Sequence, residues 1–330
     1  MADMLATERD GRVLTVLIDH PPHNFMTAEM VRELDRLTRS LRRDRSVGSV
    51  IFTGRPPDLF VSHYDVGEIL ASIERVGVAA PPWLTGVMLR IAAPIRRTPG
   101  LRTVAERSPL RGLFELYRLH DVFLRMNRMD KVFIAAINGP ATGGGCELAL
   151  ACDVRYMADA EISIGLPEMT VGFNPGAGGT QRLSRMLGTG RALEMMLEGR
   201  TLSPREAAEV GLVHRLVAPD RLRAEATESG RRLARRSPQS VRSLKRAVYD
   251  GASSQLGRGL AVERKWFMAA AGTDPSKRRW PLTPRKSQSG GRPGPTARRS
   301  APGRRAPRPT SRRTSSELSR VGGRGPGSRA

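Results

Sequence analysis

Three consecutive glycines, Gly143–Gly145, lie between an apolar strand-like run, Val132–Ile137, and an apolar helix-like run, Cys146–Cys152. Glycine has no Cβ, so the backbone there can approach a ligand closely and adopt positive φ angles. A glycine-rich turn that leads into a helix presents unpaired N–H groups and the positive end of the helix dipole to an anion. The stretch therefore predicts an anion-binding turn between a buried strand and a buried helix.

Two carboxyl groups accompany this turn. Glu147 is expected in the first turn of the helix, and Glu168 lies in a second loop. Two carboxyls near an oxyanion site suit general acid–base chemistry on a thioester. Taken alone, each acid also has a plain interpretation. Acids in a first helical turn complement the dipole by a few tenths to about 1 kcal/mol, and Glu168 follows a proline as a surface acid could.

The periodicity predicts an α/β body. Val13–Ile18 and Ser49–Thr53 are short apolar runs closed by breakers, as strands are. Met30, Leu34, Leu37 and Leu41 recur at helical spacing and form one buried stripe. This alternation is typical of a mostly parallel sheet covered by helices. Further helices are expected over residues 203–209, 220–236, 239–249 and 260–271.

Residues 10–272 resemble the crotonase superfamily, the enoyl-CoA hydratase/isomerase proteins. Four stretches carry the resemblance: FVSHYD (60–65), KVFIAAINGPATGGGCELALACD (131–153), IGLPEMTVGFNPGAGGTQRL (164–183) and GRTLSPREAAEVGLVHRLV (199–217). The resemblance implies a crotonase-like spiral of repeated ββα units over residues 1–200 and a helical trimerisation region over residues 201–273. It also implies an acyl-CoA thioester substrate and a homotrimer or homohexamer.

The resemblance also implies roles for individual residues. Glu147 and Glu168 would be the catalytic acids, and the backbone N–H groups of Tyr64 and Gly144 would bind the thioester oxygen. The substrate would contact Pro22, His23, Asn24, Tyr64, Asp65, Val66, Gly67, Gly144 and Gly176. No metal and no cofactor is implied, since CoA is part of the substrate.

The oxyanion loop departs from the family pattern. Family members usually have Gly-Ala before the aspartate, and this chain has His63 and Tyr64 before Asp65. The proposed donor at position 64 is a main-chain N–H, which any residue except proline keeps. We expect the bulk of Tyr64 to narrow or reshape the acyl pocket, and His63 to be an ordinary loop residue.

Hydration of an enoyl-CoA is the function that the resemblance favours, because isomerases of this superfamily commonly keep only the second acid. A double-bond isomerase or a carbon–carbon lyase with the same oxyanion hole is the alternative. A nucleic-acid-binding protein is a second alternative, from a different class. It would use the basic residues that follow position 273.

Two segments have no counterpart in the family. Residues 71–115 read as an insertion, either a solvated surface elaboration or a lid over the acyl pocket. Residues 275–330 hold 16 Lys and Arg and a single acid, Glu317, in a Pro/Gly/Ser-rich context. That composition predicts a disordered tail from residue 274 with nonspecific affinity for polyanions. Trp280 is its only aromatic residue, so the tail offers few side chains on which nucleic-acid bases could stack, which weakens the nucleic-acid-binding alternative. A shifted reading frame is the other explanation of this tail.

The remaining features are those of a water-soluble enzyme. No apolar stretch reaches the roughly 20 residues that span a bilayer, and no signal peptide is evident at the N-terminus, so a cytoplasmic protein without membrane contact is expected. Cys146 and Cys152 are six residues apart and would face different sides of one helix, which argues against a disulfide between them.

Overall fold

The computed structural model describes residues 4–76, 81–95, 111–252 and 254–271. The predicted basic tail and parts of the predicted insertion lie outside these residues. The body is built on one mostly parallel sheet in which only β1 runs antiparallel to its neighbour. Its strands, in spatial order, are β1 (Leu5–Asp10), β2 (Val13–Ile18), β3 (Ser49–Gly54), β4 (Val132–Ile137), β6 (Val154–Ala158) and β9 (Arg215–Val217).

A second, three-stranded sheet carries the loops that matter most for the site. It consists of β5 (Ala141–Thr142), β7 (Ile164–Gly165) and β8 (Thr201–Leu202). β5 follows β4 directly and pairs parallel with β7, so the chain after each of these strands emerges at the same edge. The glycine turn and the loop that contains Glu168 are therefore brought together.

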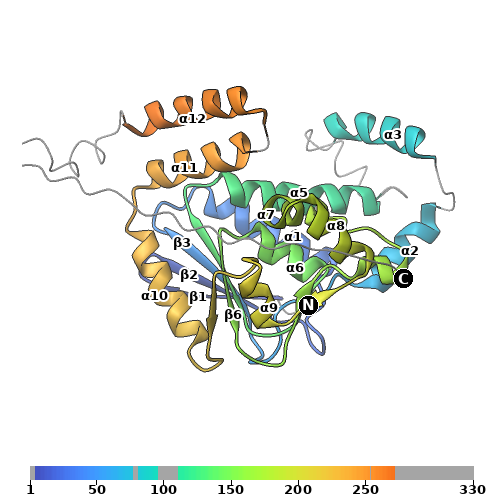
Figure 1. The fold of residues 1–330 in the computed structure, drawn as a ribbon, viewed down its shortest axis with the longest axis horizontal. Coiled ribbons are helices and arrows are strands. Elements are labelled where there is room, and N and C mark those ends of the chain that lie inside the picture. The colour runs from blue at the N-terminus through green and yellow to red at the C-terminus, as the bar shows by residue number, and fades with distance from the viewer. Residues whose placement is uncertain (1–3, 77–80, 96–110, 253, 272–330) are drawn as a thin grey trace, which may run out of the picture. The chain divides into compact units, whose positions relative to one another are not determined.

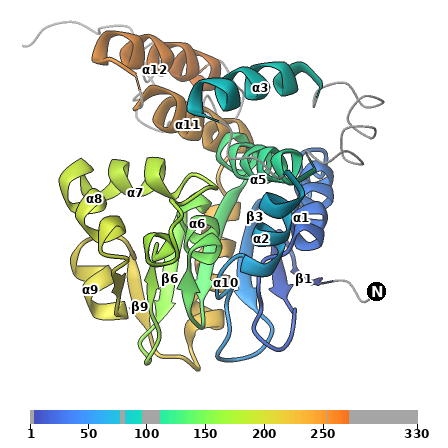
Figure 2. The ribbon, with the colours of Figure 1, turned by 90° about the vertical axis from the view of Figure 1, so that its right-hand side faces the viewer.

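Helices cover both faces of the large sheet (Figures 1 and 2). α10 (Leu222–Ala234) lies on one face, and α1 (Ala28–Leu41), α5 (Arg111–Arg128) and α6 (Gly144–Ala151) lie on the other. The other helices are α2 (Val66–Val76), α3 (Pro82–Ile95), α7 (Gly179–Leu187), α8 (Thr189–Leu197), α9 (Pro204–Glu209), α11 (Pro238–Gly251), α12 (Leu256–Ala271) and the 3₁₀ turn η1 (Glu168–Val171).

Alternation along the strands explains this layering, because successive side chains of a strand point to opposite faces. In β3, Val50 and Phe52 join the larger core on the α1 and α5 side, and Ile51 between them joins the smaller core under α10. Because helices cover both faces of the sheet, its central strands are buried on both sides, and this explains why their sequences are continuous apolar runs.

The structure confirms the predicted strands at 13–18 and 132–137 and the helix with the stripe beginning at Met30. The helix predicted at 146–152 begins earlier, at Gly144, because Gly143 adopts a positive φ of 50° and acts as its N-cap. No helix of the described residues is long and apolar enough to cross a membrane.

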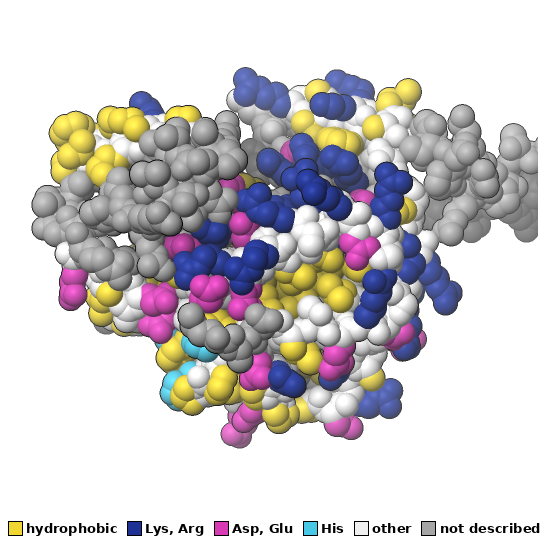
Figure 3. Space-filling view, turned by 180° about the vertical axis from the view of Figure 1, so that it is seen from behind, with side chains coloured by type: hydrophobic (Ala, Val, Ile, Leu, Met, Phe, Trp, Pro, Cys, Tyr) yellow, Lys and Arg dark blue, Asp and Glu magenta, His cyan; other side chains and the backbone are white. Residues whose placement is uncertain are grey.

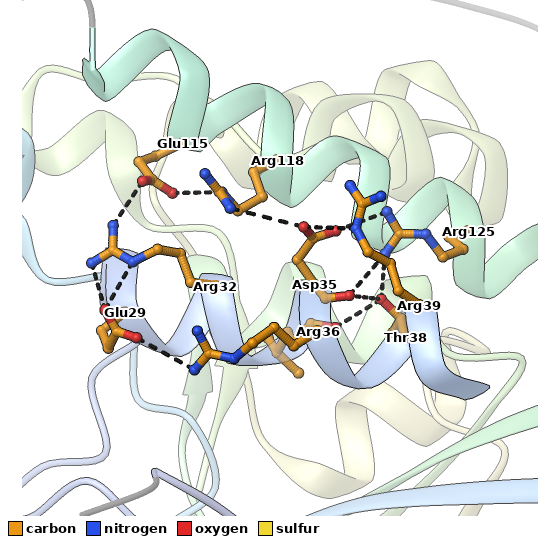
Figure 4. A network of polar contacts seen from close by, with 10 residues as sticks. Glu29, Arg32, Asp35, Arg36, Thr38, Arg39, Glu115, Arg118 and Arg125 are labelled. Atoms are coloured by element: carbon orange, nitrogen blue, oxygen red, sulfur yellow. Dashed lines mark hydrogen bonds and ion pairs between the residues drawn. The ribbon is translucent and has the colours of Figure 1, made fainter. Parts of the chain in front are cut away.

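Ion pairs join α5 to α1 (Figure 4). Buried Asp35 of α1 accepts a hydrogen bond of 2.8 Å from Arg125 of α5, and Arg32 of α1 pairs with buried Glu115 of α5 at 2.8 Å. Arg118 completes the chain of charges, since it lies 3.1 Å from Glu115 and 3.8 Å from Asp35. Because each buried charge has a partner, α5 is held in a defined position along α1.

A buried lysine joins α11 to the body. Lys245 is 6% exposed, and its ammonium group donates to the carbonyl oxygens of Met126 and Lys131, both at 2.8 Å, and to the Asp153 carboxylate at 2.7 Å. Tyr249, one turn further along α11, donates to the other Asp153 oxygen at 2.9 Å. All three donors of the ammonium group are thus used inside the protein.

We predict that Lys245→Met destabilises the fold by about 3–5 kcal/mol, because it leaves the Asp153 carboxylate and two carbonyl groups buried without their partner. Urea unfolding followed by circular dichroism would measure the loss. Lys265→Met, at an exposed lysine on α12, is the matched control and should change stability little. A loss of less than 1 kcal/mol in Lys245→Met would contradict the assignment.

Candidate functional site

The candidate site lies beyond the carboxyl ends of β2, β3 and β4, where three loops meet. Asn24, in the loop after β2, is fully buried, and its side-chain amide donates to the carbonyl oxygens of Ile18 at 3.1 Å and Phe60 at 2.8 Å. Its side-chain oxygen accepts from the N–H of His20 at 2.6 Å. Asn24 therefore ties the loop after β2 to the loop after β3, and its side chain is fully used in doing so.

The direction of the Tyr64 N–H group follows from a short parallel pairing with Met26. The Met26 N–H donates to the His63 carbonyl at 2.8 Å, and the Asp65 N–H donates to the Met26 carbonyl at 2.9 Å. Successive N–H groups of an extended chain point to opposite sides, so the Tyr64 N–H points away from Met26. On that side lies Gly144, where an added Cβ would stand 3.2 Å from the Tyr64 nitrogen.

Gly144 supplies a second N–H group because it is the first residue of α6. The first N–H groups of a helix have no acceptor within the helix. Within the described residues, the N–H groups of Gly144 and Tyr64 both lack an acceptor, whereas the Gly143 N–H donates to Gly165 at 2.9 Å. Two neighbouring backbone donors without acceptors are the arrangement that stabilises an oxyanion.

Position 145, the second residue of α6, must be glycine because there is no space for a side chain. A Cβ on Gly145 would stand 1.8 Å from the carbonyl oxygen of Val61, which no side chain can tolerate. The Thr142 N–H also donates to the Ser62 carbonyl at 2.8 Å. The start of α6 and the loop before Tyr64 are consequently packed backbone to backbone, and this contact keeps the two N–H donors together.

Glu147 projects from α6 and is only 3% exposed. One oxygen of its carboxyl accepts hydrogen bonds from the N–H groups of Ala177 at 2.7 Å and Gly179 at 2.8 Å. Burial raises the pKa of Glu147 to about 7, and the neighbouring Glu168 carboxyl raises it as well, against the two N–H donors and the Arg182 charge. Its carboxyl is thus poised to exchange a proton near neutral pH.

Glu168 begins η1 and stands on the other side of the glycine turn. One of its oxygens lies 3.4 Å from where a Cβ on Gly143 would be. Its other oxygen is buried and has no hydrogen-bond partner within the described residues, and burial raises the pKa of this carboxyl too. A buried carboxyl oxygen without a protein partner is available to a water molecule or a substrate.

The structure thus brings together Glu147, Glu168, Tyr64 and Gly144, which the sequence singled out. Gly176 lies beside them, and its carbonyl is 2.7 Å from a His120 ring nitrogen. Asp65 caps α2 by accepting from the Glu68 N–H at 3.1 Å, with Val66 and Gly67 in the first turn of that helix. Pro22 and His23 are exposed at the rim.

Sequence reasoning did not identify the groups that hold Glu147. The N–H groups that donate to Glu147 belong to the GAGG stretch, residues 176–179. Arg182 donates to the Ala177 carbonyl of the same stretch at 3.2 Å. The sequence feature that could have indicated this contact is the second cluster of glycines, at residues 176–179, soon after Glu168. Its function could not be deduced, because nothing local shows that this loop folds against α6.

The chain matches the family model described as enoyl-CoA hydratase/isomerase over residues 115–280. It is 33% identical over 265 residues to a putative enoyl-CoA hydratase/isomerase, YngF, of Bacillus subtilis, a match that covers 80% of this chain and 88% of the relative. A short-chain-enoyl-CoA hydratase of Clostridium acetobutylicum is 29% identical, with coverages of 82% and 90%.

Among solved structures, an enoyl-CoA hydratase from Bacillus anthracis matches with a TM-score of 0.65 and 28% identity, covering 82% of this chain and 92% of that one. The similarity therefore extends over the sheet and the C-terminal helices rather than over a single motif. The chain belongs to the enoyl-CoA hydratase/isomerase family, and its fold is the crotonase fold that the sequence predicted.

We predict that the buried carboxyl of Glu147 makes stability depend on pH. Its pKa is about 7 in the folded protein against an ordinary 4.5, so the folded state retains a proton that the unfolded chain releases between these values. Stability should therefore fall as pH rises through this window, by up to about 3 kcal/mol, and level off above it.

Urea unfolding of wild type and Glu147→Gln at pH 5 and pH 8 would test this. Gln keeps an oxygen for the two N–H donors but does not titrate, so the stability of the variant relative to wild type should increase by about 3 kcal/mol from pH 5 to pH 8. An equal difference at both pH values would show that Glu147 does not titrate in this range.

Proposed function

We propose that this protein is an enoyl-CoA hydratase, which adds water across the 2,3 double bond of an enoyl-CoA thioester to form a 3-hydroxyacyl-CoA. The observation that carries the proposal is the pair of N–H groups at Tyr64 and Gly144, which have no acceptor within the described residues, beside the buried carboxyl of Glu147 and the half-buried carboxyl of Glu168. Relatives at about 30% identity over most of their length bear the name enoyl-CoA hydratase, which supports the same activity here.

In the proposed mechanism, the thioester oxygen docks on the N–H groups of Tyr64 and Gly144. Negative charge grows on this oxygen as water attacks the β-carbon, so these hydrogen bonds strengthen in the transition state and lower the barrier. One such donor is typically worth about 3 kcal/mol. The CoA portion would follow the loops at Pro22–Asn24 and Tyr64–Gly67, where Asn24 acts by shaping the loop.

The two glutamates would manage the protons. Glu168 is the better candidate for the main acid–base, because one of its oxygens has no hydrogen-bond partner in the described part of the chain. It would take a proton from the attacking water and return a proton to the α-carbon. Glu147 would position the water with the oxygen that Ala177 and Gly179 do not occupy. This chemistry uses only residues of the chain, and CoA belongs to the substrate.

An isomerase or a carbon–carbon lyase of the same family could share the oxyanion hole. The second carboxyl favours hydration, because moving a double bond needs one group that shuttles a proton, whereas addition of water also needs a group that holds the water. Product analysis with crotonyl-CoA separates these reactions, since only hydration yields 3-hydroxybutyryl-CoA.

We predict that Glu147→Gln and Glu168→Gln each lower the hydration rate by roughly two to four powers of ten. Gln keeps the size of the side chain, but at position 168 it cannot accept the proton, and at position 147 an amide NH2 replaces the carboxyl oxygen that positions the water. Loss of the absorbance of the conjugated enoyl thioester would report turnover. Glu161→Gln, at an exposed site, is the control. Near-normal turnover of either variant, with an unchanged circular dichroism spectrum, would remove that residue from the mechanism.

We also propose a homotrimer, or a homohexamer of two trimers, in the cytoplasm. Large apolar side chains of α11 and α12 face solvent in the single chain, among them Leu244, Leu256, Phe267 and Met268. Hydrophobic side chains are visible at the surface on the upper right of Figure 3, where these helices lie. Apolar surface of this kind usually marks an interface.

Light scattering at micromolar concentration should therefore give the mass of at least a trimer. Replacing Phe267 and Met268 by Asp should lower the mass toward that of the monomer, because charges cannot be buried in an apolar contact without a partner. Ala224→Asp, on the exposed face of α10, should leave it unchanged. A monomeric wild-type protein would overturn the proposed assembly.

Affinity of the basic tail for polyanions stays a prediction from composition.

A further inference from the structure

The Tyr64 side chain has a definite direction although its backbone serves the oxyanion site. Its hydroxyl lies 3.5 Å from an oxygen of Glu68 in the first turn of α2. The same Glu68 oxygen accepts a 2.7 Å hydrogen bond from the N–H of Ala28, the first residue of α1. The ring therefore extends from the oxyanion loop to the point where α1 and α2 begin.

Glu115 of α5 also acts on the Tyr64 hydroxyl. Burial raises the pKa of the Tyr64 hydroxyl, and the carboxylates of Glu68 and Glu115 raise it further, against the positive charge of Arg32. Glu115 of α5 and Arg32 of α1 are paired with each other at 2.8 Å. The hydroxyl end of the ring therefore lies at Glu68 of α2, and the charges of Glu115 of α5 and Arg32 of α1 also act on it.

The base of the ring stands beside the proposed thioester position. The Tyr64 Cβ lies 3.3 Å from where a Cβ on Gly144 would be. On the other side of the glycine turn, Gly143 faces the His63 Cβ, whose ring stacks on Phe25 with centroids 4.2 Å apart. The proposed path of CoA follows that loop, so the acyl chain would leave the thioester on the other side, beside the Tyr64 ring.

We infer that Tyr64 limits the acyl group to short enoyl chains, of which crotonyl is the model, because its ring extends from the Gly144 turn to Glu68. The inference rests on the proposed function. A long alkyl chain would have to displace the ring or lie against Glu68, Glu115 and Arg32, and contact between hydrocarbon and charged groups is unfavourable.

Kinetics with crotonyl-, octenoyl- and hexadecenoyl-CoA test the inference. Wild type should show kcat/KM falling steeply with chain length, and Tyr64→Ala should raise the octenoyl-to-crotonyl ratio at least about tenfold. Tyr64→Phe, which keeps the ring, is the matched control and should retain the wild-type ratio. A wild type that prefers long chains, or a ratio that Tyr64→Ala leaves unchanged, would overturn it.

Calorimetric binding of butyryl-, octanoyl- and palmitoyl-CoA gives a readout that does not need turnover. Tyr64→Ala should gain affinity for octanoyl-CoA relative to butyryl-CoA, and Tyr64→Phe should not. If these preferences appear but no enoyl-CoA is hydrated, the hydratase proposal fails and the role of Tyr64 stands. If enoyl-CoAs are hydrated without any effect of Tyr64→Ala on chain length, Tyr64 has no such role. Failure to bind any acyl-CoA would overturn both.

Discussion

The pairing between Met26 and residues 63–65 is the constraint on which the site depends. Its two hydrogen bonds, 2.8 Å and 2.9 Å long, use the His63 carbonyl and the Asp65 N–H, and so leave the Tyr64 N–H facing Gly144. Close backbone packing of the α6 start against Val61 and Ser62 sets the spacing of these donors. Because both donors belong to the main chain, unusual side chains at 63 and 64 are compatible with the oxyanion hole.

The packing around these two N–H groups also determines the pKa values of two carboxyls. Glu147 of α6 is buried against the 177–179 loop, and Glu168 is half-buried across the glycine turn, so burial raises the pKa of each carboxyl. The two differ in their partners. Glu147 is fixed by two backbone donors, whereas one oxygen of Glu168 has no partner among the residues that the structure describes. This asymmetry is the basis on which we propose that Glu147 positions the water and Glu168 exchanges protons.

Much of this could be predicted from local sequence. The strand Val132–Ile137 is a continuous apolar run ended by breakers, and three consecutive glycines indicate a turn that needs positive φ or close approach. Both features could therefore be predicted without tertiary information. The orientation of Tyr64 was not predictable, because Glu68 and the N-terminus of α1 determine it. The contacts of Glu147 depend on residues 30 and 32 positions away, and only the folded chain brings these together.

The structure of the protein with acetoacetyl-CoA bound, a thioester that cannot be hydrated, would test the central claim most directly. The account predicts that the thioester oxygen lies about 3 Å from both the Tyr64 and the Gly144 nitrogen atoms. The β-carbon should then face Glu147 and Glu168. A thioester oxygen bound elsewhere, with these two N–H groups left to solvent, would contradict it.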